Sequence, residues 1–138
     1  MSFNEIYQIA GSAMNTQSQR LNTVASNLAN AEAAASSEET AYRALKPVFQ
    51  TVYQQTKDGA VSANVQVAGI VQSEAPLEKR YEPDHPMADE TGYVVYSNVN
   101  SVQEMADMMA ATRAFETSAD MIARANSMQQ SLLKLGAL

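Results

Sequence analysis

The sequence predicts an α+β protein in which long N- and C-terminal helices pair as a coiled coil and flank a small middle domain that contains a β-hairpin. Two observations carry this prediction. Apolar residues recur three and four positions apart at both ends, over 2–31 and 101–136, and between them the period changes to two. We therefore divide the chain into a helical domain, 1–35 and 98–138, and a β-rich middle domain, 36–97, with an extended loop rich in proline and charge.

The first segment, 2–31, is predicted to be an amphipathic helix that begins with a capping box at Ser2 and Glu5. Its a/d seam consists of Phe3, Tyr7, Ala10, Met14, Gln17, Leu21, Val24 and Leu28. The opposite face carries amides and hydroxyls, and the only charges up to residue 31 are Glu5 and Arg20. Such groups are buried at a smaller cost than charges, so we expect this face to contact other protein rather than bulk water. The alternative is an ordinary surface of low charge.

The last segment, 101–136, is predicted to be a second long helix, with a capping box at Ser101 and Glu104 and a stop at Gly136. Its apolar stripe consists of Val102, Met105, Met109, Phe115, Ala119, Ile122, Ala125, Met128, Leu132 and Leu135. We expect Phe3, Tyr7, Met14, Leu21, Val24 and Leu28 to face this stripe. A Met-rich groove for varied partners is the alternative, and a helix–helix seam is favoured.

The middle of the chain is predicted to hold strands. Residues 42–75 contain β-branched and aromatic residues around an Asp-Gly turn at 57–59, which indicates a hairpin with Pro47 near an edge or a strand start. Residues 31–41 are expected to be a frayed helix end and a loop, and 76–92 an irregular excursion. A short strand over 92–96 leads back to the second helix.

Composition narrows the possible functions. There is no cysteine, which excludes disulfides and thiolate metal sites, and the net charge of −6 argues against nucleic acid. No apolar run could span a membrane and no cleaved signal peptide is recognised. Leu, Ile, Val and Phe total only 26 of 138 residues, so the monomer is expected to be marginally stable. The lone His85 is expected to be a loop residue. No catalytic residue, metal or cofactor is predicted, although an unrecognised enzyme stays an alternative.

Two motifs resemble a known family. Arg20-Leu21-Asn22 is followed by Ala-Ser-Asn-Leu-Ala-Asn over 25–30, and near the other end stand Gly-Tyr-Val over 92–94, Asn-Val-Asn over 98–100, Glu104-Met105 and Ala-Phe-Glu over 114–116. These runs resemble the terminal motifs of bacterial flagellar axial proteins, and the proximal rod proteins in particular. The chain departs from many of them at Ala31-Glu32-Ala33, at Ser97 and at Ser118. The motif residues carried over are Arg20, Asn27, Leu28, Ala29, Asn30, Asn98, Asn100, Glu104 and Arg113.

The resemblance implies a structural subunit of the flagellar basal-body rod. Its partners would be copies of itself and other rod subunits in a helical tube, and the flagellar type III export apparatus that would deliver it without a cleaved signal. Asn27 and Asn30 would bridge to neighbouring subunits or cap the helix end. A soluble coiled-coil adaptor and another rod- or hook-type subunit are the alternatives.

Overall fold

The computed structural model describes residues 3–55 and 61–136. It confirms an α+β protein with a long helix at each end and antiparallel strands between them. The elements are α1 (Phe3–Ala29), β1 (Ala34–Ala35), β2 (Leu45–Gln55), β3 (Val61–Gln72), β4 (Glu78–Tyr81), β5 (Tyr93–Tyr96) and α2 (Ser101–Gly136).

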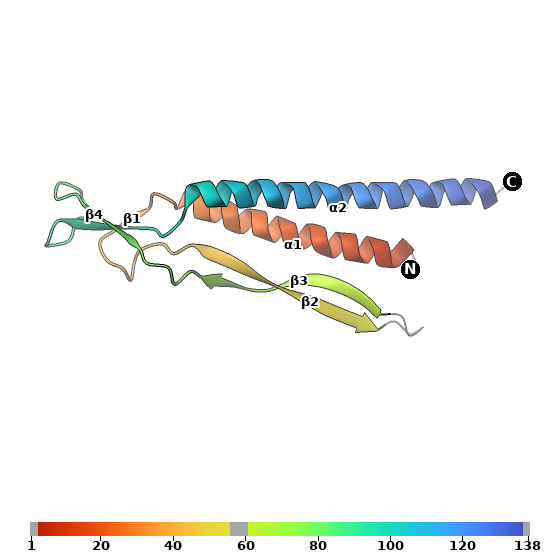
Figure 1. Cartoon of the computed structure of the whole chain (residues 1–138), viewed down its shortest axis with the longest axis horizontal. Helices are drawn as coiled ribbons and strands as arrows, with labels where there is room; N and C mark the ends of the chain where they lie inside the picture. The colour runs from red at the N-terminus through yellow and green to blue at the C-terminus, as the bar shows by residue number, and fades with distance from the viewer. Residues whose placement is uncertain (1–2, 56–60, 137–138) are drawn as a thin grey trace.

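The molecule is elongated, and its two helices run side by side in opposite directions (Figure 1). The β2–β3 hairpin lies along the other side of α1, so α1 is the middle of three layers. A small sheet lies beyond the helices at the end where α1 finishes and α2 starts. We call this end of the helix pair the sheet end. The opposite end of the pair, where α2 continues past the start of α1, is called the free end. Neither helix has a stretch, within the part of the chain described, that could cross a membrane.

The predicted hairpin is confirmed. β2 pairs antiparallel with β3 from Leu45 opposite Gln72 to Gln55 opposite Val61, with a bulge between Val48 and Phe49. The sheet has only these two strands, so Pro47 lies on an edge as expected and its missing N–H breaks no inner ladder. The predicted Asp-Gly turn lies outside the described residues.

A second sheet, in the order β1-β5-β4, was only partly predicted. The central strand β5 was expected and is well covered, since Val94 and Val95 are 0% and 5% exposed. The two flanking strands were expected to be irregular and are not. β1 has only two residues. β4 is charged, since its sequence is Glu-Lys-Arg-Tyr, and its Lys79 and Arg80 form ion pairs with Glu38 and Glu32 at 2.6 and 3.5 Å. Such short or charged edge strands carry no alternating apolar pattern.

The turn that leads into β5 depends on Gly92. Its φ of +82° is left-handed, and a Cβ there would lie 2.8 Å from Cε2 of Tyr81. Asp89 closes the same turn, because its carboxylate accepts from the Thr91 and Tyr93 amides at 2.8 and 2.9 Å. Bonds from the Thr91 hydroxyl, and then from the Tyr93 amide, hold the pKa of Asp89 below its usual value.

The face of α2 against α1 differs from the predicted stripe. A series of its buried and half-buried residues recurs four and three apart, namely Glu104, Met108, Ala111, Phe115, Ser118, Ile122 and Ala125. Four residues of the predicted stripe, Phe115, Ala119, Ile122 and Ala125, are buried or half-buried. Val102, Met105, Met109 and Leu132 are not, because they are 77, 54, 59 and 52% exposed. Alanine at two of the central seam positions lets the helices approach closely, but it contributes little to a hydrophobic pattern.

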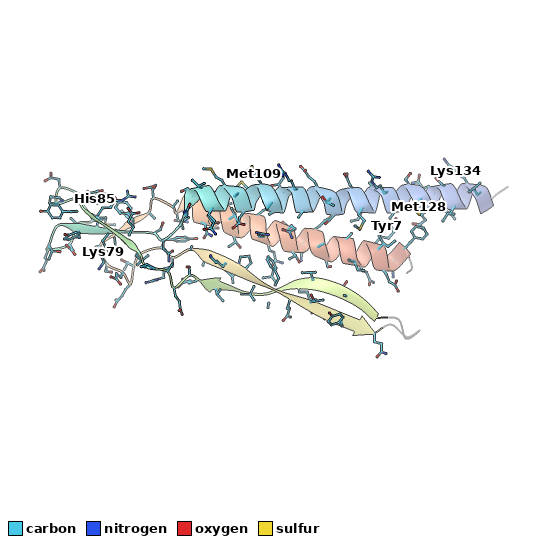
Figure 2. All side chains as sticks on the ribbon, viewed as in Figure 1. Tyr7, Lys79, His85, Met109, Met128 and Lys134 are labelled. Carbon is cyan, nitrogen blue, oxygen red and sulfur yellow. The ribbon has the colours of Figure 1, made fainter. Side chains whose placement is uncertain are left out.

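The predicted α1 seam agrees better with the structure. Val24 is 3% exposed, and Phe3, Tyr7, Met14, Leu21 and Leu28 are half-buried. The buried apolar core is small and consists largely of alanine and valine, while sixteen large apolar side chains of the described residues are exposed. A chain with this distribution offers apolar surface for contacts between subunits. Figure 2 shows one of these side chains, Met109, on the edge of α2 that faces away from α1.

Candidate functional site

The most complete polar site is a junction where α1, β2 and α2 meet, formed by Asn27, Tyr42, Leu45 and Glu104. The Asn27 side-chain amide donates to the Leu45 carbonyl at 2.8 Å and to Oε2 of Glu104 at 3.1 Å. Its oxygen accepts from the Leu45 amide at 2.8 Å and from the Tyr42 hydroxyl at 3.0 Å. Asn27 is 1% exposed, so all of its hydrogen-bonding capacity is satisfied inside the chain.

Glu104 is part of this junction rather than of a capping box. Asn100 caps α2, because its Oδ1 accepts from the Val102 and Gln103 amides at 3.1 Å each. The predicted cap at Ser101 is therefore wrong by one residue, since asparagine outcompetes a serine that is already helical. The Glu104 carboxylate is left free to bond Asn27. The other predicted capping box, at Ser2, falls outside the described residues.

Tyr42 is the fourth member of the junction, and its hydroxyl donates to Oδ1 of Asn27. Its burial, and secondarily the negative charge of Glu104, raise the pKa of the Tyr42 hydroxyl. The hydroxyl therefore stays protonated and continues to donate to Asn27. This role of Tyr42 was not predicted from the sequence, because Tyr42 stands in a segment that was interpreted only as strand.

Two further motif residues hold the parts together. Arg20 pairs with Asp107 at 2.8 Å and so joins α1 to α2. Asn98 accepts from the Ala44 amide at 2.7 Å and donates to the Ala75 carbonyl at 2.8 Å, which fixes both flanks of the hairpin. The motifs that looked like separate signals at the two ends of the chain are thus brought together at the sheet end.

The other motif residues lie elsewhere. Asn27, which was expected to bridge to a neighbouring subunit or to cap the helix end, is buried and bonds within its own chain. Asn30 donates to the Ser26 carbonyl at 2.8 Å, as a residue capping the helix end would. Ala29 and Arg113 are exposed, and Leu28 is half-buried.

The polar face of α1 contacts the hairpin. Oγ1 of Thr16 donates to the Val65 carbonyl at 3.2 Å, and the Val65 amide donates to Oγ of Ser12 at 3.4 Å. This face was expected to contact other protein chains, and here part of it contacts the hairpin of its own chain. The sequence pattern did not reveal that this contact is with the chain's own hairpin.

The free end is apolar and open. A groove of about 410 Å³ lies between the start of α1 and the second half of α2, with Phe3, Ile6, Met121 and Met128 among its lining residues. The Tyr7 hydroxyl donates across the helix pair here to Oε1 of Gln129 at 3.2 Å. Figure 2 shows Tyr7 and Met128 at this end of the helix pair.

Within 3–55 and 61–136, no group of three or more His, Asp or Glu side chains is placed to hold a metal ion. His85 lies at the sheet end (Figure 2), where its Nδ1 accepts from the Met87 amide at 3.0 Å within a turn.

Models of known protein families match both ends of the chain. Residues 8–32 match the family described as "Flagella basal body rod protein", and residues 90–135 match "Flagellar basal body rod FlgEFG protein C-terminal". The two matches cover most of α1 and α2. They define the class as the flagellar basal-body rod proteins.

Individual relatives narrow this class. The "Flagellar basal-body rod protein FlgC" of Escherichia coli O157:H7 is 41% identical over 136 residues, covering 99% of each chain. The protein of the same name from Salmonella typhimurium is 40% identical over the same length, and that from Aquifex aeolicus is 40% identical over 116 residues, 84% of this chain and 83% of its own. The chain therefore belongs to the FlgC family. The relatives' names describe rod proteins, which is consistent with a structural protein rather than an enzyme.

Proposed function

We propose that the chain is a structural subunit of the proximal rod of the bacterial flagellar basal body. The observation that carries this proposal is the similarity to FlgC over 99% of the chain, at 41% identity. The clustering of the motif residues at one junction supports it, because that junction sets how the terminal helices and the hairpin are arranged.

Within the rod, the helices of 1–35 and 98–138 form the inner layer as a coiled coil, and 36–97 forms the outer part. The spacing of four and three along the α2 seam supports a coiled coil. The exposed apolar residues of α2, including Val102, Met105 and Met109, pack between subunits. Load is then spread over many helix contacts, and torque passes along the tube that encloses the export channel.

The partners follow from this role. They are further copies of the chain, other rod subunits, and the flagellar type III export apparatus, which delivers the subunit to the periplasmic span without a cleaved signal. A thin core supports delivery in an unfolded state, since little free energy is needed to open such a chain.

Complementation of a strain that lacks the gene tests the proposal. The wild-type chain should restore swimming. Leu28→Asp and Phe115→Asp should abolish it with expression intact, because each places a charge at a half-buried helix contact. Leu28→Met and Phe115→Leu are the matched controls and should swim. Normal swimming by the two aspartate variants would contradict the packing, and failure of the wild-type chain would contradict the function.

A further inference from the structure

The β2–β3 hairpin is anchored to α1 at two points, and the two anchors use opposite edges of the hairpin. Near the sheet end, the Asn27 side chain bonds both backbone groups of Leu45 in β2 at 2.8 Å. Nearer the free end, Ser12 and Thr16 bond the N–H and C=O of Val65 in β3, at 3.4 and 3.2 Å. Here β3 lies against α1, and β2 is the element farthest from the helices (Figure 1).

The second half of β2 therefore has an open edge. Both backbone groups of Val65 point toward α1, so its pair with Thr51 is one of the antiparallel pairs without ladder bonds. Thr51 then turns its own N–H and C=O away from β3, and so do Phe49 and Tyr53, two positions away on either side. In the described part of the chain, β2 has no strand neighbour besides β3, so these groups have no strand to pair with.

This edge lacks the protection that the other strand edges have. α1 covers the edge of β3 at Val65, β1 has two residues, and β4 is charged. The second half of β2, by contrast, reads Val-Phe-Gln-Thr-Val-Tyr-Gln-Gln over 48–55, with no charge and no proline. Tyr53 is 72% exposed there. An uncharged edge rich in β-branched and aromatic residues is a template for pairing with another strand.

We propose that this edge pairs antiparallel with the same edge of a second copy of the chain, about a two-fold axis at Thr51. In this register Thr51 lies opposite Thr51 of the second copy, and Phe49 lies opposite Tyr53. Threonine pairs and aromatic pairs are among the cross-strand pairs that stabilise antiparallel sheets. Because the segment is uncharged, no like charges meet across the axis. The edge is thus complementary to itself.

The resulting four-stranded sheet, in the order β3-β2-β2-β3, is closed. In each copy, Ser12 and Thr16 of α1 cover the outer edge of β3 at Val65, so no third copy can add a strand there. The helices do not obstruct the pairing, since they lie on the side of the hairpin away from this part of β2 (Figure 1).

A closed pair has a different place from a rod contact. A two-fold contact ends at two copies, whereas a helical tube is built by contacts that do not close. The pairing therefore goes beyond the proposed function and belongs to the free subunit. It protects the open edge until the subunit is incorporated, and it must dissociate before incorporation.

A disulfide tests the register. The chain has no cysteine, so an introduced thiol can bond only to its copy. The two Thr51 residues would form a ladder-bonded pair, whose Cα atoms lie about 5.5 Å apart, within the range of about 4.4–6.8 Å that a disulfide spans. The purified Thr51→Cys chain should therefore oxidise to a covalent dimer. Gln66→Cys is the matched control and should not, because Gln66 is also exposed but lies on β3.

A charge tests the pairing without a covalent bond. In Thr51→Lys, two lysines would lie opposite each other across the axis and repel. Sedimentation equilibrium of the purified chain should show a wild-type dimer, and Thr51→Lys should raise its dissociation constant at least about tenfold. Gln66→Lys adds the same charge to the other strand and should leave the dissociation constant unchanged. Circular dichroism of each variant checks that the fold is kept.

The outcomes are distinct. A monomeric wild-type chain, a dimer that Thr51→Lys does not weaken, or equal disulfide formation by Gln66→Cys would each overturn the proposal. A dimer that Leu132→Ser weakens and Thr51→Lys does not would place the contact at the free end instead. Complementation by the wild-type chain decides the rod function separately, because it does not depend on the oligomeric state of the purified protein.

Discussion

The two ends of the helix pair are held in different ways. At the sheet end, Asn27 makes four hydrogen bonds to three parts of the chain and is 1% exposed. At the free end, α2 is exposed at every described position from 126 onward, and Leu132 and Leu135 are 52 and 69% exposed. Directional bonds thus fix one end within the chain, whereas the other presents non-directional apolar surface.

This difference separates two tasks. Hydrogen bonds specify a single geometry because each donor needs its acceptor, so the sheet end determines how the hairpin and helices are arranged. Apolar side chains such as Met128 accept partners of varied shape. Substitutions at the sheet end should therefore affect the folding of the isolated chain, and substitutions at the free end should affect assembly.

Asn27→Ala should have the largest effect. It leaves the Leu45 backbone, the Tyr42 hydroxyl and Glu104 without their partner in a buried site, and we expect a loss of about 3 kcal/mol in the free energy of unfolding. Urea denaturation measures this. Asn15→Ala, on the exposed part of the same helix, is the control and should change stability by less than about 0.5 kcal/mol. Equal effects would remove the distinction between the ends.

Ala111→Leu tests the seam between the two ends. Ala111 is 0% exposed against α1, so a larger side chain must push the helices apart and should cost about 1–3 kcal/mol. Thermal melting followed by circular dichroism would record the loss. Its neighbour Ala110 is exposed, and Ala110→Leu should be almost neutral. A neutral Ala111→Leu would mean that the helices do not pack closely here.

Gly92→Ala should destabilise the sheet end by about 1–2 kcal/mol. The reason is its left-handed φ and the approach of a new Cβ to within 2.8 Å of Tyr81. Gly11→Ala gives the opposite sign, because Gly11 lies within α1 with open space around it, and should stabilise by about 0.5–1 kcal/mol. Both are measured by urea denaturation, and two changes of the same sign would refute the assignment.

Leu132→Ser should have the smallest effect on the isolated chain, within about 0.5 kcal/mol, because the side chain is already 52% exposed. Its effect should appear in assembly, as reduced swimming in complementation. Leu132→Met is the control for assembly. A marked loss of stability in the isolated Leu132→Ser chain would show that the free end is more ordered than its exposure indicates.

The sequence predicted the parts better than their contacts. The helices and the hairpin were predicted because apolar residues recur about every 3.6 positions, or every 2 positions, over long segments, and such repeats are strong signals. The α2 stripe was placed on the wrong side at Val102, Met105 and Met109, because these large apolar residues are exposed while the small Ala111, which the stripe left out, is buried. Asn27 and Glu104 were noted as motif residues, but no local pattern indicates that an asparagine and a glutamate 77 positions apart bond to each other.

The antiparallel arrangement of α1 and α2 has a consequence for the order of folding. The bonds that join the helices connect residues far apart in sequence, 77 positions for Asn27 and Glu104 and 122 for Tyr7 and Gln129. Closing loops of this length costs conformational entropy and slows folding. Whichever terminus is released first, its helix can pair with the other helix only after nearly the whole chain has been released. The subunit therefore reaches its final fold only after a delay.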